Sequence, residues 1–172
     1  MKKSDGRWVE RSTSTELGEL LTATGQELVN SVHDNANRPT FQLIVAGERQ
    51  DLSPSIRDEI YQIGRELLRN AVQHAHAHHI EAEIRYDDDA FILLVRDDGK
   101  GIDPIVVKEG GRTGHWGLPG VRERAKQIRA DIDFWTENRA GTEVRLRVPG
   151  SVAYRAVADK VRFKLFRREK IS

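Results

Sequence analysis

Hydrophobic side chains recur at helical spacing early in the chain, between residues 13 and 33. Leucines and valines lie three or four positions apart there, which is the spacing of one face of a helix. Thr13 and Glu16 fit a capping box at the start of this helix. Gly18 and Gly25 weaken it, so we expect it to need a partner surface.

A longer helix is predicted from residue 54 to about residue 75, because Ser53 suits an N-cap and Pro54 suits the first helical position. The cluster of helix-breaking residues at 35–39 separates this helix from the preceding one, and we place a domain boundary there. A third amphipathic helix is predicted over 118–130.

Alternation of hydrophobic and polar residues predicts strands, most of them paired in hairpins. Because hairpins are mixed with helices and regular βαβ alternation is missing, we expect an α/β fold. The expected architecture is a two-layer sandwich, with helices on one face of a mixed, mainly antiparallel, five-stranded sheet. The strands are expected at 41–46, 80–86, 91–96, 132–137 and 142–148.

The composition excludes several classes of protein. The chain has 172 residues, of which 38% are hydrophobic, so it suits one domain of ordinary size and not two. Its 28 basic and 27 acidic residues give a net charge of +1, which argues against a nucleic-acid-binding protein. The absence of cysteine excludes disulfides and thiolate metal sites. No run is apolar enough to cross a bilayer and no signal-peptide pattern is present, so we expect a cytoplasmic domain.

Three parts are expected along the chain: an N-terminal segment over 1–37, a central domain over 38–150, and a basic tail over 151–172. The tail mixes lysine and arginine with a few large apolar residues. Contact with anionic lipid or with a partner domain is one interpretation of that mixture. A solvated terminus is the interpretation that we favour.

The predicted helix 54–75 carries one polar stripe, formed by Glu66, Asn70 and His74 at intervals of four residues. Asn70 falls in line with Ile63, where the pattern asks for an apolar residue. A polar residue that interrupts a strong apolar pattern marks either a satisfied hydrogen bond in the core or a functional site. The helix alone leaves both open.

Two glycine-containing segments follow. Asp97-Asp98-Gly99-Lys100-Gly101 comes directly after a buried strand, where a carboxylate can accept a hydrogen bond from an exocyclic amine. An ordinary turn is the alternative, and the spacing does not fit an EF-hand. The segment 110–120 is rich in glycine and leads into a helix, whose N-terminus attracts phosphate. A plain flexible loop is the alternative there, and no P-loop motif is present.

Taken in order, these segments resemble the ATP-binding domains of sensor histidine kinases. Residues 66–75 resemble the N box, 97–101 the G1 box, 114–118 the G2 box, and 141–142 the terminal Gly-Thr element. The likeness extends from about residue 41 to residue 149. It is greatest to the nitrate- and degradation-type sensor kinases of the gyrase, chaperone and histidine-kinase ATPase superfamily.

The resemblance implies a Bergerat-type ATP-binding fold that uses ATP and Mg²⁺. Asn70 would be the Mg²⁺ ligand, Glu66 would help to deprotonate or orient the accepting histidine, and Asp97 would hold the adenine amino group. These roles make Glu66 and Asn70 the catalytic residues. The residues expected to bind nucleotide are Asn70, His74, Asp97, Gly99, Gly101, Arg112, Thr113, Gly114, His115, Gly117, Leu118 and Thr142.

Several of these positions carry finer expectations. Gly99 and Gly101 would make room for the base, and Gly114 and Gly117 would shape a lid near the phosphates. Many relatives carry Lys or Arg at the position of Gln73, so phosphate neutralisation would fall to Arg69 or Arg112. Thr142 would support the adenine end, and His74 would lie near the phosphates.

The resemblance also implies partners. Such a domain transfers the γ-phosphate of ATP to a histidine on a dimerisation domain, for relay to a response regulator, and its parent protein can be attached to a membrane. We interpret residues 13–33 as a remnant of the second dimerisation helix, His33 as part of a linker, and the chain as a fragment without the acceptor histidine and without the helices that form the dimer. The alternatives are a gyrase-type ATPase, an anti-sigma-type serine kinase and a non-catalytic nucleotide-binding module.

Four histidines at positions 74, 76, 78 and 79 invite a zinc interpretation. Zinc needs convergent ligands, and no cysteine accompanies them. We favour a surface cluster at the end of the helix, where histidine can interact with the helix dipole.

Overall fold

A computed structural model describes residues 16–102, 117–137 and 140–155 of the chain. A helix and a 3₁₀ turn precede the first strand, and a long helix follows it. Two hairpins make up most of the sheet. The elements are α1 (Glu16–Asn30), a 3₁₀ turn (Asn35–Asn37), β1 (Thr40–Gly47), α2 (Pro54–His74), β2 (His79–Tyr86), β3 (Ala90–Asp97), α4 (Leu118–Gln127), β4 (Asp131–Glu137), β5 (Gly141–Pro149) and α5 (Gly150–Ala153).

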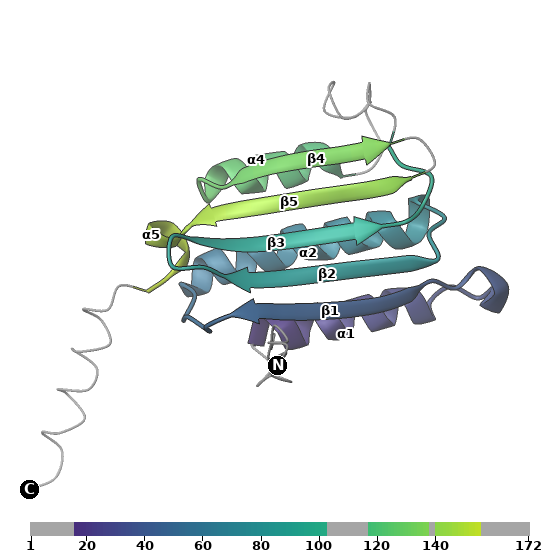
Figure 1. The fold of residues 1–172 in the computed structure, drawn as a ribbon, viewed down its shortest axis with the longest axis horizontal. Helices are drawn as coiled ribbons and strands as arrows, with labels where there is room; N and C mark the ends of the chain where they lie inside the picture. The colour runs from purple at the N-terminus through teal and green to yellow at the C-terminus, as the bar shows by residue number, and fades with distance from the viewer. Residues whose placement is uncertain (1–15, 103–116, 138–139, 156–172) are drawn as a thin grey trace, which may run out of the picture.

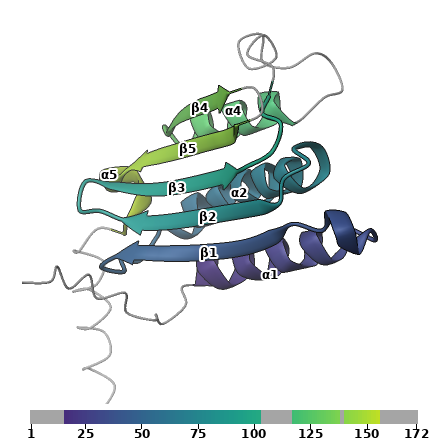
Figure 2. The ribbon, with the colours of Figure 1, turned by 45° about the vertical axis from the view of Figure 1, so that its right-hand side comes forward.

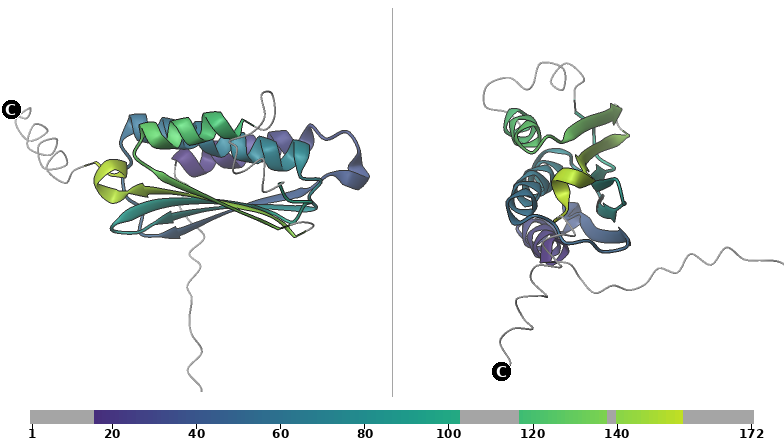
Figure 3. Two further views of the ribbon diagram at one scale, coloured as in Figure 1. Left: turned by 90° about the horizontal axis from the view of Figure 1, so that it is seen from above. Right: turned by 90° about the vertical axis from the view of Figure 1, so that its left-hand side faces the viewer.

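The sheet has five strands in the order β1-β2-β3-β5-β4 (Figure 1). β1 pairs with β2 in parallel, and all other neighbours are antiparallel. The helices lie on one face, as the view from above shows, with α2 flanked by α1 and α4 (Figure 3). The predicted α/β sandwich with a mixed, mainly antiparallel sheet is therefore confirmed.

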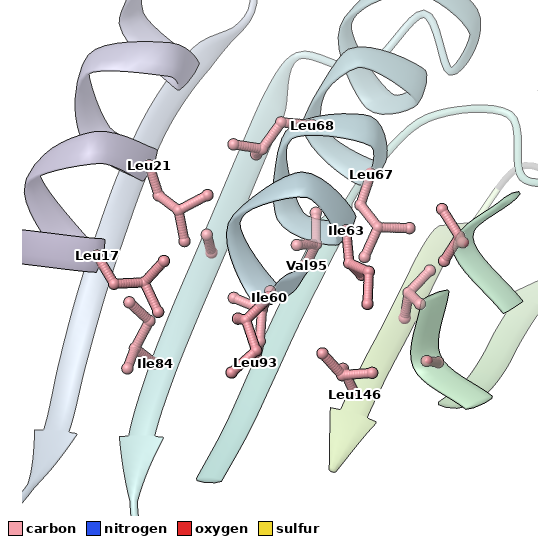
Figure 4. Close-up of a cluster of buried hydrophobic side chains, with 14 of the residues drawn as sticks. Leu17, Leu21, Ile60, Ile63, Leu67, Leu68, Ile84, Leu93, Val95 and Leu146 are labelled. Atoms are coloured by element: carbon pink, nitrogen blue, oxygen red, sulfur yellow. The ribbon is translucent and has the colours of Figure 1, made fainter. Parts of the chain in front are cut away.

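The core lies between the helices and the sheet (Figure 4). Inward positions alternate with outward ones along the strands, so one face of each strand meets the helices. α2 contributes side chains spaced three or four residues apart, as the stripe in its sequence predicted. The largest fully buried side chains include Leu17, Leu21, Ile60, Ile63, Leu68, Ile84, Leu93 and Leu146.

The opposite face of the sheet carries ion pairs across the strands. Arg96 on β3 contacts Glu81 and Glu83 on β2, at 3.0 and 3.4 Å, and Glu143 on β5 at 2.6 Å. These pairs of opposite charge on neighbouring strands explain why the outward positions of the alternating strands are polar.

Helix α1 lies next to β1 (Figure 2), and its Leu17 and Leu21 belong to the same hydrophobic core as the rest of the domain. Leu21 is fully buried and packs against Gly64 of α2, where an added Cβ would come within 2.8 Å of it. The ring of Phe41 on β1 packs against Gly25. The helix expected at the N-terminal side of a boundary near residue 37 is thus packed into the helical layer, and α2 and β1 supply the partner surface that its glycines called for.

The packed unit also extends past residue 150, where the sequence places the start of the tail. Ala153 in α5 is fully buried, and its carbonyl accepts a 2.8 Å hydrogen bond from the N–H of Ser53. The hydroxyl of Tyr154 donates to the carbonyls of Asp87 and Ala90, each at 2.9 Å. Residues 151–155 therefore close the end of the sheet and are part of the domain.

Two helix ends differ slightly from expectation. α2 ends at His74 and α4 ends at Gln127, each followed within two residues by a positive φ, 52° at His76 and 54° at Arg129. A left-handed residue cannot continue a helix, so each helix stops before it.

Among the described residues, no helix is both long and apolar enough to span a membrane.

Candidate nucleotide-binding site

A pocket opens between α2 and the sheet, at the end where β3 and the α2 C-terminus meet. Its walls are mainly aliphatic, and its polar side chains come from three different elements. The lining residues are Leu67, Asn70, Ala71, Ala75, Val95, Asp97, Gly101, Ile102, Leu118, Thr142 and Val144. Apolar walls with a few convergent polar groups are typical of a small-molecule site.

Asp97 lies at the end of β3, directly opposite Thr142 on β5. Its carboxylate accepts a 3.0 Å hydrogen bond from the N–H of Gly99 and another from the backbone N–H of Thr142. Burial raises the pKa of Asp97, the two backbone hydrogen bonds lower it in part, and neighbouring Asp98 raises it further. The pocket thus holds a desolvated carboxyl group in a fixed orientation, suited to accept a hydrogen bond from a ligand.

Thr142 and Asn70 are buried polar residues of the same pocket, 7% and 8% exposed. The Thr142 hydroxyl is buried and finds no hydrogen-bond partner among the residues that the structure describes. Such a group carries a desolvation cost unless a ligand or water satisfies it. Asn70 faces the pocket from α2, at the position where the sequence placed a polar residue in an apolar stripe.

Glu66 lies one turn before Asn70 on α2 and contacts the start of α4. Its carboxylate accepts a 2.6 Å hydrogen bond from Arg69. Gly117, the N-cap of α4, lies against the same carboxylate and has a φ of +59°. The side chain of Glu66 therefore connects the N-box helix with the segment that resembles the G2 box.

Comparison with known proteins identifies the family. Residues 55–152 match the family described as "Histidine kinase-, DNA gyrase B-, and HSP90-like ATPase". The chain belongs to this ATPase family.

Several sensor kinases are similar to this chain in sequence. The chain is 29% identical over 112 residues to the signal transduction histidine-protein kinase/phosphatase DegS of Bacillus subtilis, covering 65% of the chain and 29% of DegS. It is 33% identical over 101 residues to the sensor protein NarQ homolog of Haemophilus influenzae, covering 58% of the chain and 17% of that protein. The chain thus spans less than a third of the length of these relatives.

The fold is also similar to that of a solved histidine kinase domain. The histidine kinase domain of the blue-light activated histidine kinase from Erythrobacter litoralis EL346 superposes with a TM-score of 0.61 at 21% sequence identity. The match covers 83% of this chain and 67% of that one. The resemblance to nitrate- and degradation-type sensor kinases drawn from the four motifs is confirmed.

The structure brings together most of the described residues expected at the ATPase site. Asn70, Asp97, Gly101, Leu118 and Thr142 line one pocket. Gly101 has a φ of +78°, a backbone conformation that favours glycine. The expected residues Arg112, Thr113, Gly114 and His115 lie outside the described residues.

Other expected residues lie next to the pocket and not in its wall. His74 is half-buried in the last turn of α2, outside the lining. Gly99, expected to make room for the base, packs against the carbonyl of Ala75, and a Cβ there would collide with that carbonyl. Arg69, a candidate for phosphate neutralisation, is paired with Glu66.

Some residues of the site were missed from the sequence. Thr136 on β4 holds Ile102 in the pocket wall: its hydroxyl accepts from the N–H of Ile102 at 2.7 Å and donates to the carbonyl of the same residue at 3.0 Å. The sequence signal that could have indicated Thr136 is its place on the same face of its strand as Ile132 and Phe134. Within residues 16–102, 117–137 and 140–155, no group of three or more His, Asp or Glu side chains is arranged to hold a metal ion.

Proposed function

We propose that this chain is the ATP-binding catalytic domain of a sensor histidine kinase. It transfers the γ-phosphate of ATP to a histidine on a dimerisation domain, for relay to a response regulator. The observation that carries the proposal is the convergence of Asn70, Asp97 and Thr142, from three elements, in one apolar pocket. The sensor-kinase relatives favour this function over a gyrase-type ATPase or an anti-sigma-type serine kinase.

Adenine is the base that suits the pocket. The Asp97 carboxylate accepts a hydrogen bond from the exocyclic amine of adenine, and the buried Thr142 hydroxyl hydrogen-bonds at the same end. Guanine presents a carbonyl in place of that amine, so its oxygen would face the carboxylate unpaired. A buried polar group left unpaired is a strong source of discrimination.

The residues present fit a magnesium ion next to the phosphates. Asn70 supplies an uncharged amide oxygen at the pocket wall, a donor type suited to a cation that keeps several waters and phosphate oxygens as ligands. When bound, Mg²⁺ neutralises the charge of the phosphates.

The transfer itself depends mostly on alignment. Glu66 hydrogen-bonds the imidazole of the accepting histidine and takes up its proton, as a general base on the same helix as Asn70. Arg69 holds the Glu66 carboxylate at 2.6 Å and fixes its orientation. The N-terminus of α4, beside Glu66, offers N–H groups to an anionic phosphate.

Partners and location follow from this reaction. The acceptor histidine lies on a dimerisation domain, through whose helices the kinase dimerises, and the parent protein can be membrane-attached. The use of ATP and of a response regulator places the catalytic domain in the cytoplasm.

Phosphotransfer in trans tests the proposal. The chain is incubated with γ-labelled Mg-ATP and a separately supplied histidine-containing dimerisation domain. We expect acid-labile label on that domain, none on the chain alone, and loss of transfer in Glu66→Ala and Asn70→Ala. Gln73→Ala, an exposed change on the same helix, is the matched control and should transfer normally. Acid-stable label on a serine, or no transfer with any dimerisation domain, would contradict the proposal.

A further inference from the structure

The turn between α2 and β2 is tied to the segment after β3 by one carboxylate. Oδ1 of Asp98 accepts hydrogen bonds from the backbone N–H of His78 at 2.7 Å and of His79 at 2.9 Å. The N–H of Asp98 donates to the carbonyl of His79 at 3.3 Å. A single exposed side chain thus organises two consecutive N–H groups at the start of β2.

A second set of contacts joins the same segment to the end of α2. The N–H of Lys100 donates a 2.8 Å hydrogen bond to the carbonyl of Ala75, the C-cap of the helix. Gly99 is buried against that carbonyl, with no room for a Cβ. Residues 98–100 therefore contact both the C-cap carbonyl of α2 and the turn that follows it.

These contacts connect the two polar ends of the nucleotide pocket. Asp97 precedes Asp98 directly, and Ala75, the C-cap of α2, lies five residues after Asn70. Asp97 and Ala75 both line the pocket. The hydrogen bonds of residues 98–100 to Ala75, His78 and His79 therefore fix the position of the Asp97 carboxylate relative to α2.

We propose that Asp98 is a positioning residue, which sets the placement of Asp97 relative to the Asn70 helix so that one nucleotide engages both ends of the site. The inference rests on the proposed function and adds to it a residue that touches no ligand. Its action is through Asp97, since its own side chain points to the α2–β2 turn.

The charges around Asp98 suit this role. Burial alone would raise its pKa, but the N–H groups of His79 and His78 and the nearby imidazoles hold the pKa of Asp98 below its ordinary value. The Asp98 carboxylate is therefore ionised at neutral pH and makes charge-assisted hydrogen bonds. The imidazole of His79 is itself held by Thr40, at 2.7 Å from Nδ1 to Oγ1.

A double-mutant cycle separates positioning from a general structural role. The affinity for Mg-ATP is measured by calorimetry for the wild type, Asp98→Ala, Asp97→Asn and the double variant, at a temperature where circular dichroism shows all four folded. We expect Asp98→Ala to weaken binding about tenfold in the wild-type background and less than about twofold in the Asp97→Asn background, since coupled residues are non-additive. Asp88→Ala, an exposed aspartate at the other end of the same hairpin, is the matched control and should leave affinity unchanged.

Asp98→Asn gives a further test, because its amide oxygen can take the place of Oδ1. We expect this variant to bind ATP within about threefold of the wild type. If Asp98→Ala does not fold, the cycle is run with Asp98→Ser, whose hydroxyl can accept from one of the two N–H groups.

The outcomes are distinct. The positioning role would be overturned if the losses of Mg-ATP affinity from the two single changes multiply in the double variant. It would also be overturned if Asp98→Asn binds Mg-ATP as weakly as Asp98→Ala. Either result would leave the proposed function intact. Absence of ATP binding by the wild type would overturn the proposed function and this inference with it.

Discussion

Glu66 and Gly117 are in direct contact, although 50 residues separate them in sequence: the carboxylate lies where a side chain at position 117 would be. Gly117 also has a φ of +59°. Both facts require glycine at this position, at the junction between the helix of the proposed general base and the start of α4.

Replacement of this glycine should affect both stability and transfer. Gly117→Ala forces a Cβ onto the Glu66 carboxylate in a left-handed conformation, which alone costs about 1–2 kcal/mol. We expect a free energy of unfolding lower by at least that amount, measured by urea denaturation, and slower phosphotransfer. Gly120→Ala, three residues on in α4 with open space around it, should be neutral or slightly stabilising. Equal effects of the two changes would argue against the contact.

Asn70→Ala should abolish the dependence of ATP binding on Mg²⁺, because the metal loses its protein ligand. Calorimetric titration with ATP, with and without Mg²⁺, measures this. Gln73→Ala on the same helix should retain the wild-type dependence. An Asn70→Ala variant that still responds to Mg²⁺ as the wild type does would place the metal elsewhere.

Asp97→Asn should weaken ATP binding by about 1–3 kcal/mol, because an amide presents donors where the adenine amine needs an acceptor. The preference for ATP over GTP should shrink in parallel. Calorimetry with both nucleotides tests the assignment, and an unchanged ATP affinity would remove Asp97 from the adenine site.

The same substitution should stabilise the unliganded chain. The folded-state pKa of Asp97 is raised, chiefly by burial, so the folded state favours the protonated form and this group lowers stability as pH rises from the unfolded-state pKa to the raised folded-state pKa. Below about pH 3.9 the carboxyl group is protonated in both states and the cost disappears. Thermal melts should therefore show Asp97→Asn more stable than the wild type at pH 7, with a smaller difference in acid. A difference that does not change with pH would contradict the burial of this carboxyl group.

Helix α1 should contribute strongly to stability. Leu21→Ala removes a fully buried side chain against Gly64 and is expected to cost about 2–5 kcal/mol in urea denaturation. Leu20→Ala, at the neighbouring position that is 41% exposed, should cost less than about 0.5 kcal/mol. Similar, small losses for both would mean that α1 is an appendage and not part of the core.

Local sequence patterns were enough to predict the elements, and they marked two polar positions that the family resemblance then assigned to a nucleotide site. Periodicity located α2 and the two hairpins, and Asn70 was visible because it interrupts an apolar stripe. Asp97 was visible because a charged residue ends a buried strand. These signals lie within one element each, so no knowledge of tertiary contacts was needed.

The remainder depends on contacts between distant residues. The packing of α1 relies on the fit of Leu21 to Gly64 and of Phe41 to Gly25, pairs that no local pattern reveals. The true reason for glycine at position 99 is the Ala75 carbonyl, which belongs to a different element.

The most direct test of the account is a map of where ATP binds on this chain. Amide signals in ¹H–¹⁵N spectra are followed while ADP, or a non-hydrolysable ATP analogue with Mg²⁺, is added. The account predicts that the signals of Asn70, Gly101 and Thr142, which line one pocket from α2, from the segment after β3 and from β5, shift together and saturate with a single affinity. The signals of Arg85 and Arg147 on the outer face of the sheet should stay in place. Shifts confined to the outer face, or no shifts at saturating nucleotide, would contradict it.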